Sequence, residues 1–399
     1  MAPLLNLEEP ARPTPQGFAF AALFALGFRP FYLLASAFAA LSVPLWALQF
    51  SGLLGQPYLA GPVWHAHEML FGFTLAVIVG FLFTAGRNWT NLPTPSGWAL
   101  AALATLWLAA RVLVLTPFAA AAAVANVAFP LAAALALAKP FIQARSKRNY
   151  FFIGLLGLLA LAAAVIHLSQ LRLLALPTWP ALQVALDVVL FILAVMGGRV
   201  IPMFTNNGVP GAAATRRPWV EKAALGSVLA LLAADALGLT GWPVAALALL
   251  ACAAHAWRWA LWQPWRTLRV PLVWVLHLAY LWVPLHLLLR AGAEAGWLMP
   301  SLAAHALTVG AVGGLIIGMM VRTARGHTGR PLRADRWETA CFALVALAAV
   351  VRVALPLLAP AQTLHAVLAS ATLWSAGFAV YAVRYWPVLS RPRLDGRPG

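Results

Sequence analysis

The chain has 399 residues, of which 63% are hydrophobic and only 9% are charged, and its formal net charge at pH 7 is +17. Soluble proteins carry roughly 25% charged residues, so this composition excludes an ordinary soluble domain and predicts an all-α polytopic membrane protein. The positive charge lies between apolar runs, where the positive-inside rule places it. It therefore does not indicate a nucleic-acid partner.

Twelve apolar runs come close to the roughly 20 residues that a membrane-spanning helix needs. Their approximate ranges are 31–50, 66–86, 98–116, 119–138, 151–171, 180–198, 222–239, 242–260, 271–289, 302–321, 338–358 and 363–383. We therefore predict one transmembrane domain over 31–385. Residues 1–30 are expected to form a cytosolic tail with an interfacial lead-in, and 386–399 a second cytosolic tail.

The basic residues predict the orientation of these helices. If both termini are cytoplasmic, all but four of the 27 lysines and arginines fall at cytoplasmic helix ends or in cytoplasmic segments. The four exceptions are Arg111, Arg172, Arg290 and Arg352. This distribution favours twelve helices with both ends of the chain inside.

A weak repeat relates the second, sixth and tenth helices. Each ends in an arginine (Arg87, Arg199 and Arg322) and is followed by a polar turn that contains glycine or proline. The period of four helices suggests three four-helix units. Cys252 and Cys341 lie in apolar runs without a CxxC pattern, which excludes a disulfide framework and covalent attachment of a c-type haem.

The stretch Trp64–Gly72 is the most unusual part of the chain, because two histidines and a glutamate open an apolar helix there. Ionisable groups in such positions are costly and usually functional. Counting about 1.5 Å per residue from the arginine at the cytoplasmic end of each helix places His65, His67 and His305 near the outer side of the membrane. His277 lies deeper, towards the inner side.

Helical spacing also predicts which faces these residues share. His65 and Glu68 are expected on one face, along a stripe of small residues that includes Gly72 and Gly80, with His67 turned about 100° away. A similar stripe through Gly310, Gly314 and Gly318 runs beside His305. Such stripes mark close helix packing, and a flat macrocycle could also lie against them.

Imidazole suits iron and copper, and a neighbouring carboxylate can orient a ligating histidine. The predicted metal ligands are His65, His67, His305 and His277, with Glu68 as an orienting or proton-relay group. The alternative is that these histidines only hydrogen-bond neighbouring helices. That structural role is favoured for the remaining buried or interfacial histidines, namely His167, His255, His286 and His365.

Several further residues are candidates for binding. Arg199 and Arg322 could hold an anion such as a haem propionate or a lipid phosphate, or could only anchor the helix end. Asp187, within the sixth helix, could be a proton relay, an ion site or a neutral hydrogen-bonded acid. Weaker candidates for the cofactor site are His327, Arg29 and Asn206.

Several motifs distributed along the chain carry a resemblance to a known family. They are Gly27–Phe31, Trp64–Phe73, Gly198–Gly208, Pro271–His277, His305–Gly310 and Met319–Leu332. With these motifs the sequence resembles the NnrS family of bacterial membrane proteins. The resemblance implies an inner-membrane protein with haem and copper, linked to nitric oxide metabolism, denitrification and resistance to nitrosative stress. It leaves open whether the protein is an enzyme, and it strengthens His277 and His327 as candidates.

Haem–copper oxidases offer a fold-level analogy, because their helices 2 and 10 hold a low-spin haem. The resulting hypothesis is that His65 or His67, together with His305, ligates a b-type haem, while the other histidine and Glu68 hold or assist copper. The expected partners are membrane lipid, nitric oxide or a related small molecule, and an electron donor. Alternatives are a secondary transporter with Glu68 and Asp187 as coupling sites, and a membrane sensor or scaffold.

Overall fold

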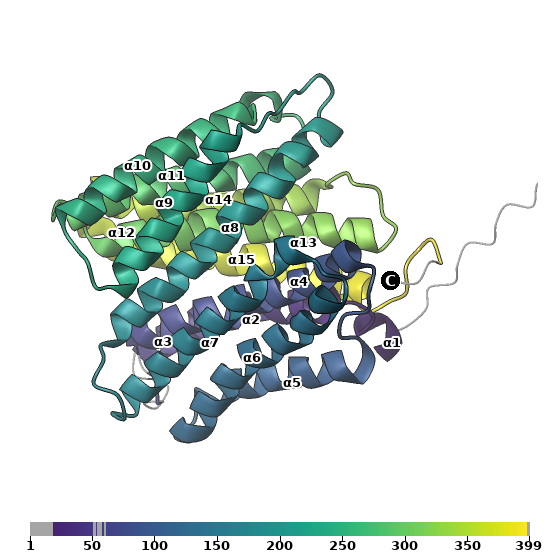
Figure 1. Cartoon of the computed structure of the whole chain (residues 1–399), viewed down its shortest axis with the longest axis horizontal. Coiled ribbons are helices and arrows are strands. Elements are labelled where there is room, and N and C mark those ends of the chain that lie inside the picture. The colour runs from purple at the N-terminus through teal and green to yellow at the C-terminus, as the bar shows by residue number, and fades with distance from the viewer. Residues whose placement is uncertain (1–18, 51–52, 54–57, 60, 397–399) are drawn as a thin grey trace, which may run out of the picture.

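Helices form all the regular structure in the part of the chain that is described (Figure 1). The structure is a computed structural model, and it describes residues 19–50, 53, 58–59 and 61–396. The predicted N-terminal cytosolic tail therefore lies mostly outside the described residues. Its lead-in contains a short helix, α1 (Phe20–Leu23), and the first long helix begins at residue 28.

The long helices follow the predicted runs closely. The first half of the chain contains α2 (Phe28–Phe50), α3 (Gly61–His67), α4 (Leu75–Thr90), α5 (Gly97–Leu113), α6 (Ala119–Gln143), α7 (Phe151–Gln170) and α8 (Thr178–Gly208). The second half contains α9 (Pro218–Ala236), α10 (Trp242–Leu261), α11 (Pro271–Glu294), α12 (Pro300–His305), α13 (Gly314–His327), α14 (Arg336–Leu358) and α15 (Thr363–Leu389).

Ten helical segments of the described chain are long and apolar enough to cross a membrane. The other two predicted spans are also helical. The helix α5 is apolar but has only 17 residues, and α9 carries Glu221, Lys222 and Asp235. The all-helical membrane architecture is therefore confirmed, and the count of twelve spans stays a prediction.

The second and tenth helices share an irregularity that the sequence did not predict. A π-helix, η1 (Glu68–Thr74), joins α3 to α4, and a second π-helix, η4 (Ala306–Gly313), joins α12 to α13. Each begins directly after a candidate histidine, and π segments frequently mark functional sites. The sixth helix, α8, has no such segment. The second and tenth helices are thus alike, whereas the threefold repeat stays a prediction.

The stripes of small residues pack against neighbouring helices. A Cβ at Gly310 would overlap the ring of Trp282 on α11, and a Cβ at Gly72 would lie 2.6 Å from Cε1 of Phe38 on α2. The prediction of close packing is confirmed. The suggestion that a macrocycle lies against these stripes is wrong, because other helices already cover them.

Both ends of the described chain lie at one end of the helix bundle, opposite to α3 and α12 (Figure 1). The backbone nitrogen of Ala19 donates a hydrogen bond to the carbonyl of Ser390, at 3.0 Å. Arg29 is fully buried and donates to the carbonyls of Leu389 and Arg391, at 2.9 and 2.8 Å. Arg29 therefore ties the first long helix to the last, at the end of the bundle away from His65, His67 and His305.

Candidate functional site

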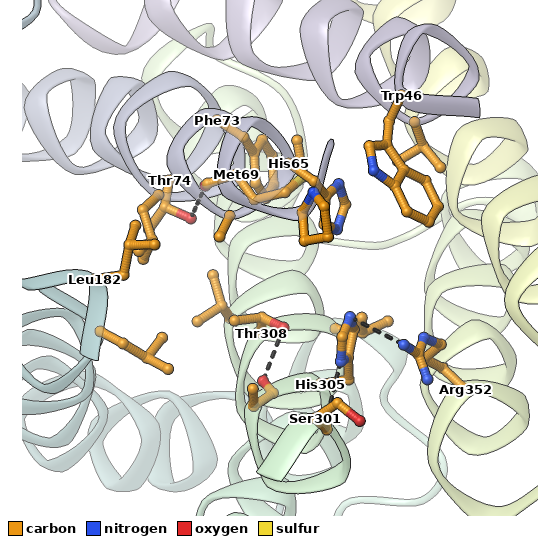
Figure 2. Close-up of a pocket in the computed structure, with 18 of the residues that line it drawn as sticks. Trp46, His65, Met69, Phe73, Thr74, Leu182, Ser301, His305, Thr308 and Arg352 are labelled. Carbon is orange, nitrogen blue, oxygen red and sulfur yellow. Dashed lines mark hydrogen bonds between the residues drawn. The ribbon is translucent and has the colours of Figure 1, made fainter. Parts of the chain in front are cut away.

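A cavity of about 570 Å³ opens between the second and tenth helices. His65 at the end of α3 and His305 at the end of α12 face each other across it (Figure 2). Their rings are 14° from parallel, and the ring centroids are 6.4 Å apart. The structure thus brings together two of the predicted ligands, from positions about 240 residues apart in the sequence.

The backbone sets the tautomer of His305. Its Nδ1 lies 2.7 Å from the carbonyl oxygen of Ser301, which can only accept a hydrogen bond, so Nδ1 carries the proton and Nε2 the lone pair. Nη2 of Arg352, on α14, lies 3.4 Å from that Nε2. On the facing helix, Nδ1 of His65 is buried and has no hydrogen-bond partner.

Apolar side chains form most of the remaining wall of this cavity. Met69 and Phe73 from η1, Val309 from η4 and Trp374 from α15 all line it. The hydroxyl of Thr308 also lines it, but donates to the carbonyl of Ala304 at 2.9 Å (Figure 2). The imidazoles and Arg352 thus face a largely apolar chamber, which would favour a ligand that is mostly apolar.

His67 lies in a separate, fully buried polar cluster. Its Nδ1 is 2.8 Å from Oε1 of Glu68, and Arg111 of α5 forms an ion pair with the same carboxylate oxygen and a hydrogen bond with Asn126. The rings of His67 and His167 meet edge to face, with centroids 4.9 Å apart. Buried charges are stable only when paired in this way.

Tyr58, in the segment before α3, completes this cluster. Burial raises the pKa of Tyr58 to about 12, so its hydroxyl keeps its proton at neutral pH. That hydroxyl donates to the carbonyl of His167, which leaves its oxygen to accept from Nδ1 of His167, both at 3.1 Å. The Nε2 atom of each histidine, His67 and His167, therefore carries a lone pair. Both atoms are buried and have no hydrogen-bond partner.

The predicted faces of the second helix are wrong in one respect. Glu68 does share a face with Gly72, because both lie against Arg111. His65, however, lines the cavity, whereas His67 is the histidine that contacts Glu68. The packing of α3 against α2 and α8, which spacing along one helix does not specify, decides which histidine faces the cavity.

The other predicted residues lie elsewhere. Nε2 of His277 is 2.8 Å from Oγ1 of Thr205, and His277 lines neither of the two cavities described here. Asn206 exchanges hydrogen bonds with the backbone of Ala214 and closes its own turn. Both contacts match the structural alternative, so the assignment of these two residues to a cofactor site gains no support.

Asp187 forms an ion pair that the sequence did not predict. Its Oδ1 lies 3.1 Å from Nη1 of Arg290, and the same guanidinium binds Asp235 at 2.5 Å. Gln183 also donates to Asp187 at 3.1 Å. The arginine comes from α11, a helix that sequence spacing could not place beside α8.

A second cavity, of about 720 Å³, lies at the opposite ends of the second and tenth helices. Arg199, Arg322 and His327 line it, together with Arg148. His305 and Arg322 are 17 residues apart on one helix, or roughly 25 Å. These arginines are therefore too far from the His65–His305 cavity to bind the propionates of a haem held there.

Sequence reasoning missed Arg111, Arg352 and His167. The two arginines were visible as exceptions to the distribution of basic residues, because a cation in the outer half of a spanning helix requires a partner. His167 was assigned a structural role because it stands near a helix end.

The fold and these contacts define a polytopic helical membrane protein with buried histidines between its second and tenth helices. In the described residues no three metal-binding side chains form a cluster around a common point. Comparison with known proteins identifies the family: the chain belongs to the NnrS family, whose model, described as NnrS protein, matches residues 22–393. No curated protein matches the chain.

Proposed function

We propose that this protein is a haem- and copper-containing protein of the bacterial inner membrane that handles nitric oxide by redox chemistry and protects against nitrosative stress. Its family links it to nitric oxide, and the observation that carries the rest is the facing pair of His65 and His305. We infer that this pair holds a b-type haem.

The distance between the two rings fits a shared metal. A metal bound to a ring nitrogen at about 2 Å would lie roughly 3 Å from that ring's centroid, so two imidazoles that held one ion could have centroids roughly 6 Å apart. The His65–His305 spacing of 6.4 Å matches this value. A haem would need fewer ligands from the protein than a bare metal ion, so His65 and His305 would be enough to hold it where the described side chains form no three-ligand cluster.

The surrounding residues prepare this pair for the cofactor. The Ser301 carbonyl holds the His305 proton on Nδ1 and so leaves Nε2 as the ligating atom. Arg352 offers a cation beside the cavity for a carboxylate of the cofactor, and the apolar wall keeps water away. When bound, a haem would supply a one-electron redox couple and an iron able to bind nitric oxide.

We assign copper to the neighbouring cluster. In both His67 and His167, Nδ1 is engaged in a hydrogen bond, whereas Nε2 is buried and has no hydrogen-bond partner. Glu68 orients His67 through Nδ1, which is the usual arrangement behind a ligating histidine. Two neutral imidazoles in a water-poor pocket suit a copper ion.

A secondary transporter is disfavoured. Glu68 and Asp187, the acids that would couple transport to an ion, are paired with Arg111 and Arg290. A carboxylate that is neutralised by a buried guanidinium has little tendency to take up a coupling cation.

The test is the absorption spectrum and metal content of the purified protein and its single alanine variants. Wild type should show a Soret band that shifts on addition of nitric oxide. His65→Ala and His305→Ala should each lose most of that band, and His67→Ala should keep it while losing copper. His365→Ala, at an exposed position, is the matched control and should behave as wild type. An unchanged haem spectrum in His305→Ala would overturn the assignment.

A further inference from the structure

The second cavity lies at the end of the bundle that faces away from the paired histidines. Three helix ends, of α4, α8 and α13, surround it together with residues 146–149. The three helices are those whose arginine-bearing ends resemble each other in sequence. The cavity shares no lining residue with the His65–His305 cavity, so it does not depend on the haem proposed above.

Three guanidinium groups line this cavity. Arg199 is half-buried, and its Nη1 donates to Oδ1 of Asn149 at 2.7 Å. Arg322 is also half-buried, with its guanidinium 3.7 Å from the centre of the Phe204 ring. Arg148 is exposed at the rim. No carboxylate of the described residues lines the cavity.

The carboxylates in the described part of the protein do not neutralise these three arginines. The chain has ten acidic residues, and Glu8 and Glu9 lie outside the described residues. Each of the other eight forms an ion pair with an arginine that is not one of these three; these acids are Glu68, Asp187, Glu221, Asp235, Glu294, Asp335, Glu338 and Asp395. The described part of the protein thus has no anion left for Arg148, Arg199 and Arg322.

Like charges gathered in a cavity with low-dielectric walls repel each other and attract an anion. The walls also have an apolar part, formed by Met196, Met203, Met319 and Trp89. Methionine adapts to irregular apolar shapes. The site therefore combines a cationic rim with flexible apolar walls.

We propose that this cavity binds a phosphate group, and that the apolar walls hold the chain attached to it. Arginine binds phosphate oxygens through a planar fork of N–H donors, which suits this arrangement. The same chemistry is offered by the headgroup of an anionic phospholipid and by free phosphate, and the test separates these two sources.

The experiment measures the thermal unfolding of delipidated protein in a neutral detergent. Phosphatidylglycerol, phosphatidylcholine and inorganic phosphate are added separately, at matched ionic strength. A ligand that binds the folded state raises the Tm in a concentration-dependent manner. A lipid site predicts a rise with phosphatidylglycerol that phosphatidylcholine and phosphate do not match. An equal rise with inorganic phosphate supports the same site with free phosphate as its ligand.

Variants show whether the effect belongs to this cavity. Arg199→Gln with Arg322→Gln should weaken binding by about 10-fold or more. Arg148→Gln, at an exposed position, should fold normally and weaken it to a smaller extent. Arg87→Gln is the matched control, because Arg87 is exposed on α4 and does not line the cavity. The proposal is overturned if no additive raises the Tm of wild type, or if the arginine variants respond as Arg87→Gln does.

Discussion

Three arginines each contact a polar residue inside this membrane protein. Arg111, Arg290 and Arg352 all depart from the distribution expected of basic residues. In the structure each contacts a residue that the sequence had marked as a functional candidate, namely Glu68, Asp187 and His305 respectively. A cation placed far from the cytoplasmic helix ends is costly, and a polar partner reduces that cost.

The pair of Arg111 and Glu68 allows a direct test. Arg111→Met should leave a fully buried carboxylate without its partner and lower the free energy of unfolding by about 3–5 kcal/mol. The decrease would be measured as a lower Tm in detergent. Adding Glu68→Gln should restore part of the loss, because it removes the unpaired charge. If the double variant is as unstable as the sum of the two single variants, the two groups are not coupled.

At the scale of helices, packing was easier to predict than orientation. A stripe of glycines shows where another helix can approach closely, and this depends on short-range spacing alone. The direction of the histidines depends on how α3 and α12 pack against neighbouring helices, which short-range spacing does not specify. For that reason the close packing was predicted correctly and the face shared by His65 and Glu68 was not.

Gly310 tests the packing of the tenth helix. Gly310→Ala should lower the free energy of unfolding by about 1–3 kcal/mol, because the added Cβ would overlap Trp282. Gly226→Ala is the matched control. Gly226 lies in α9 with nothing within 4 Å of an added Cβ, so the change should be neutral or stabilising by up to about 1 kcal/mol. Equal Tm values for both variants would contradict the packing argument.

At the scale of the whole molecule, the two ends of the bundle differ in chemistry. His65 and His305 meet at one end. At the other end, where Ala19 and Ser390 also lie, are arginines with no carboxylate partner among the described residues. The positive-inside rule predicts that the arginine end is cytoplasmic.

Reporter fusions test this orientation. Green fluorescent protein fused to the C-terminus should fluoresce, because it folds in the cytoplasm. Alkaline phosphatase inserted in the segment 171–177, between α7 and α8, should be active because that segment is predicted to lie outside. In the control the two reporters are exchanged, and neither fluorescence nor phosphatase activity is expected. Fluorescence from a reporter in 171–177 would reverse the assigned orientation.

Composition and spacing determined that this chain is a helical membrane protein, because a backbone in lipid must satisfy its hydrogen bonds within helices. They also identified His65, His67 and His305 as candidate functional residues, because ionisable groups are rare in apolar runs. Only the tertiary structure decided that His65 faces His305 and that His67 contacts Glu68 and His167. These pairings join helices that are distant in sequence, and the register across each π-helix results from packing against neighbours that local spacing does not specify.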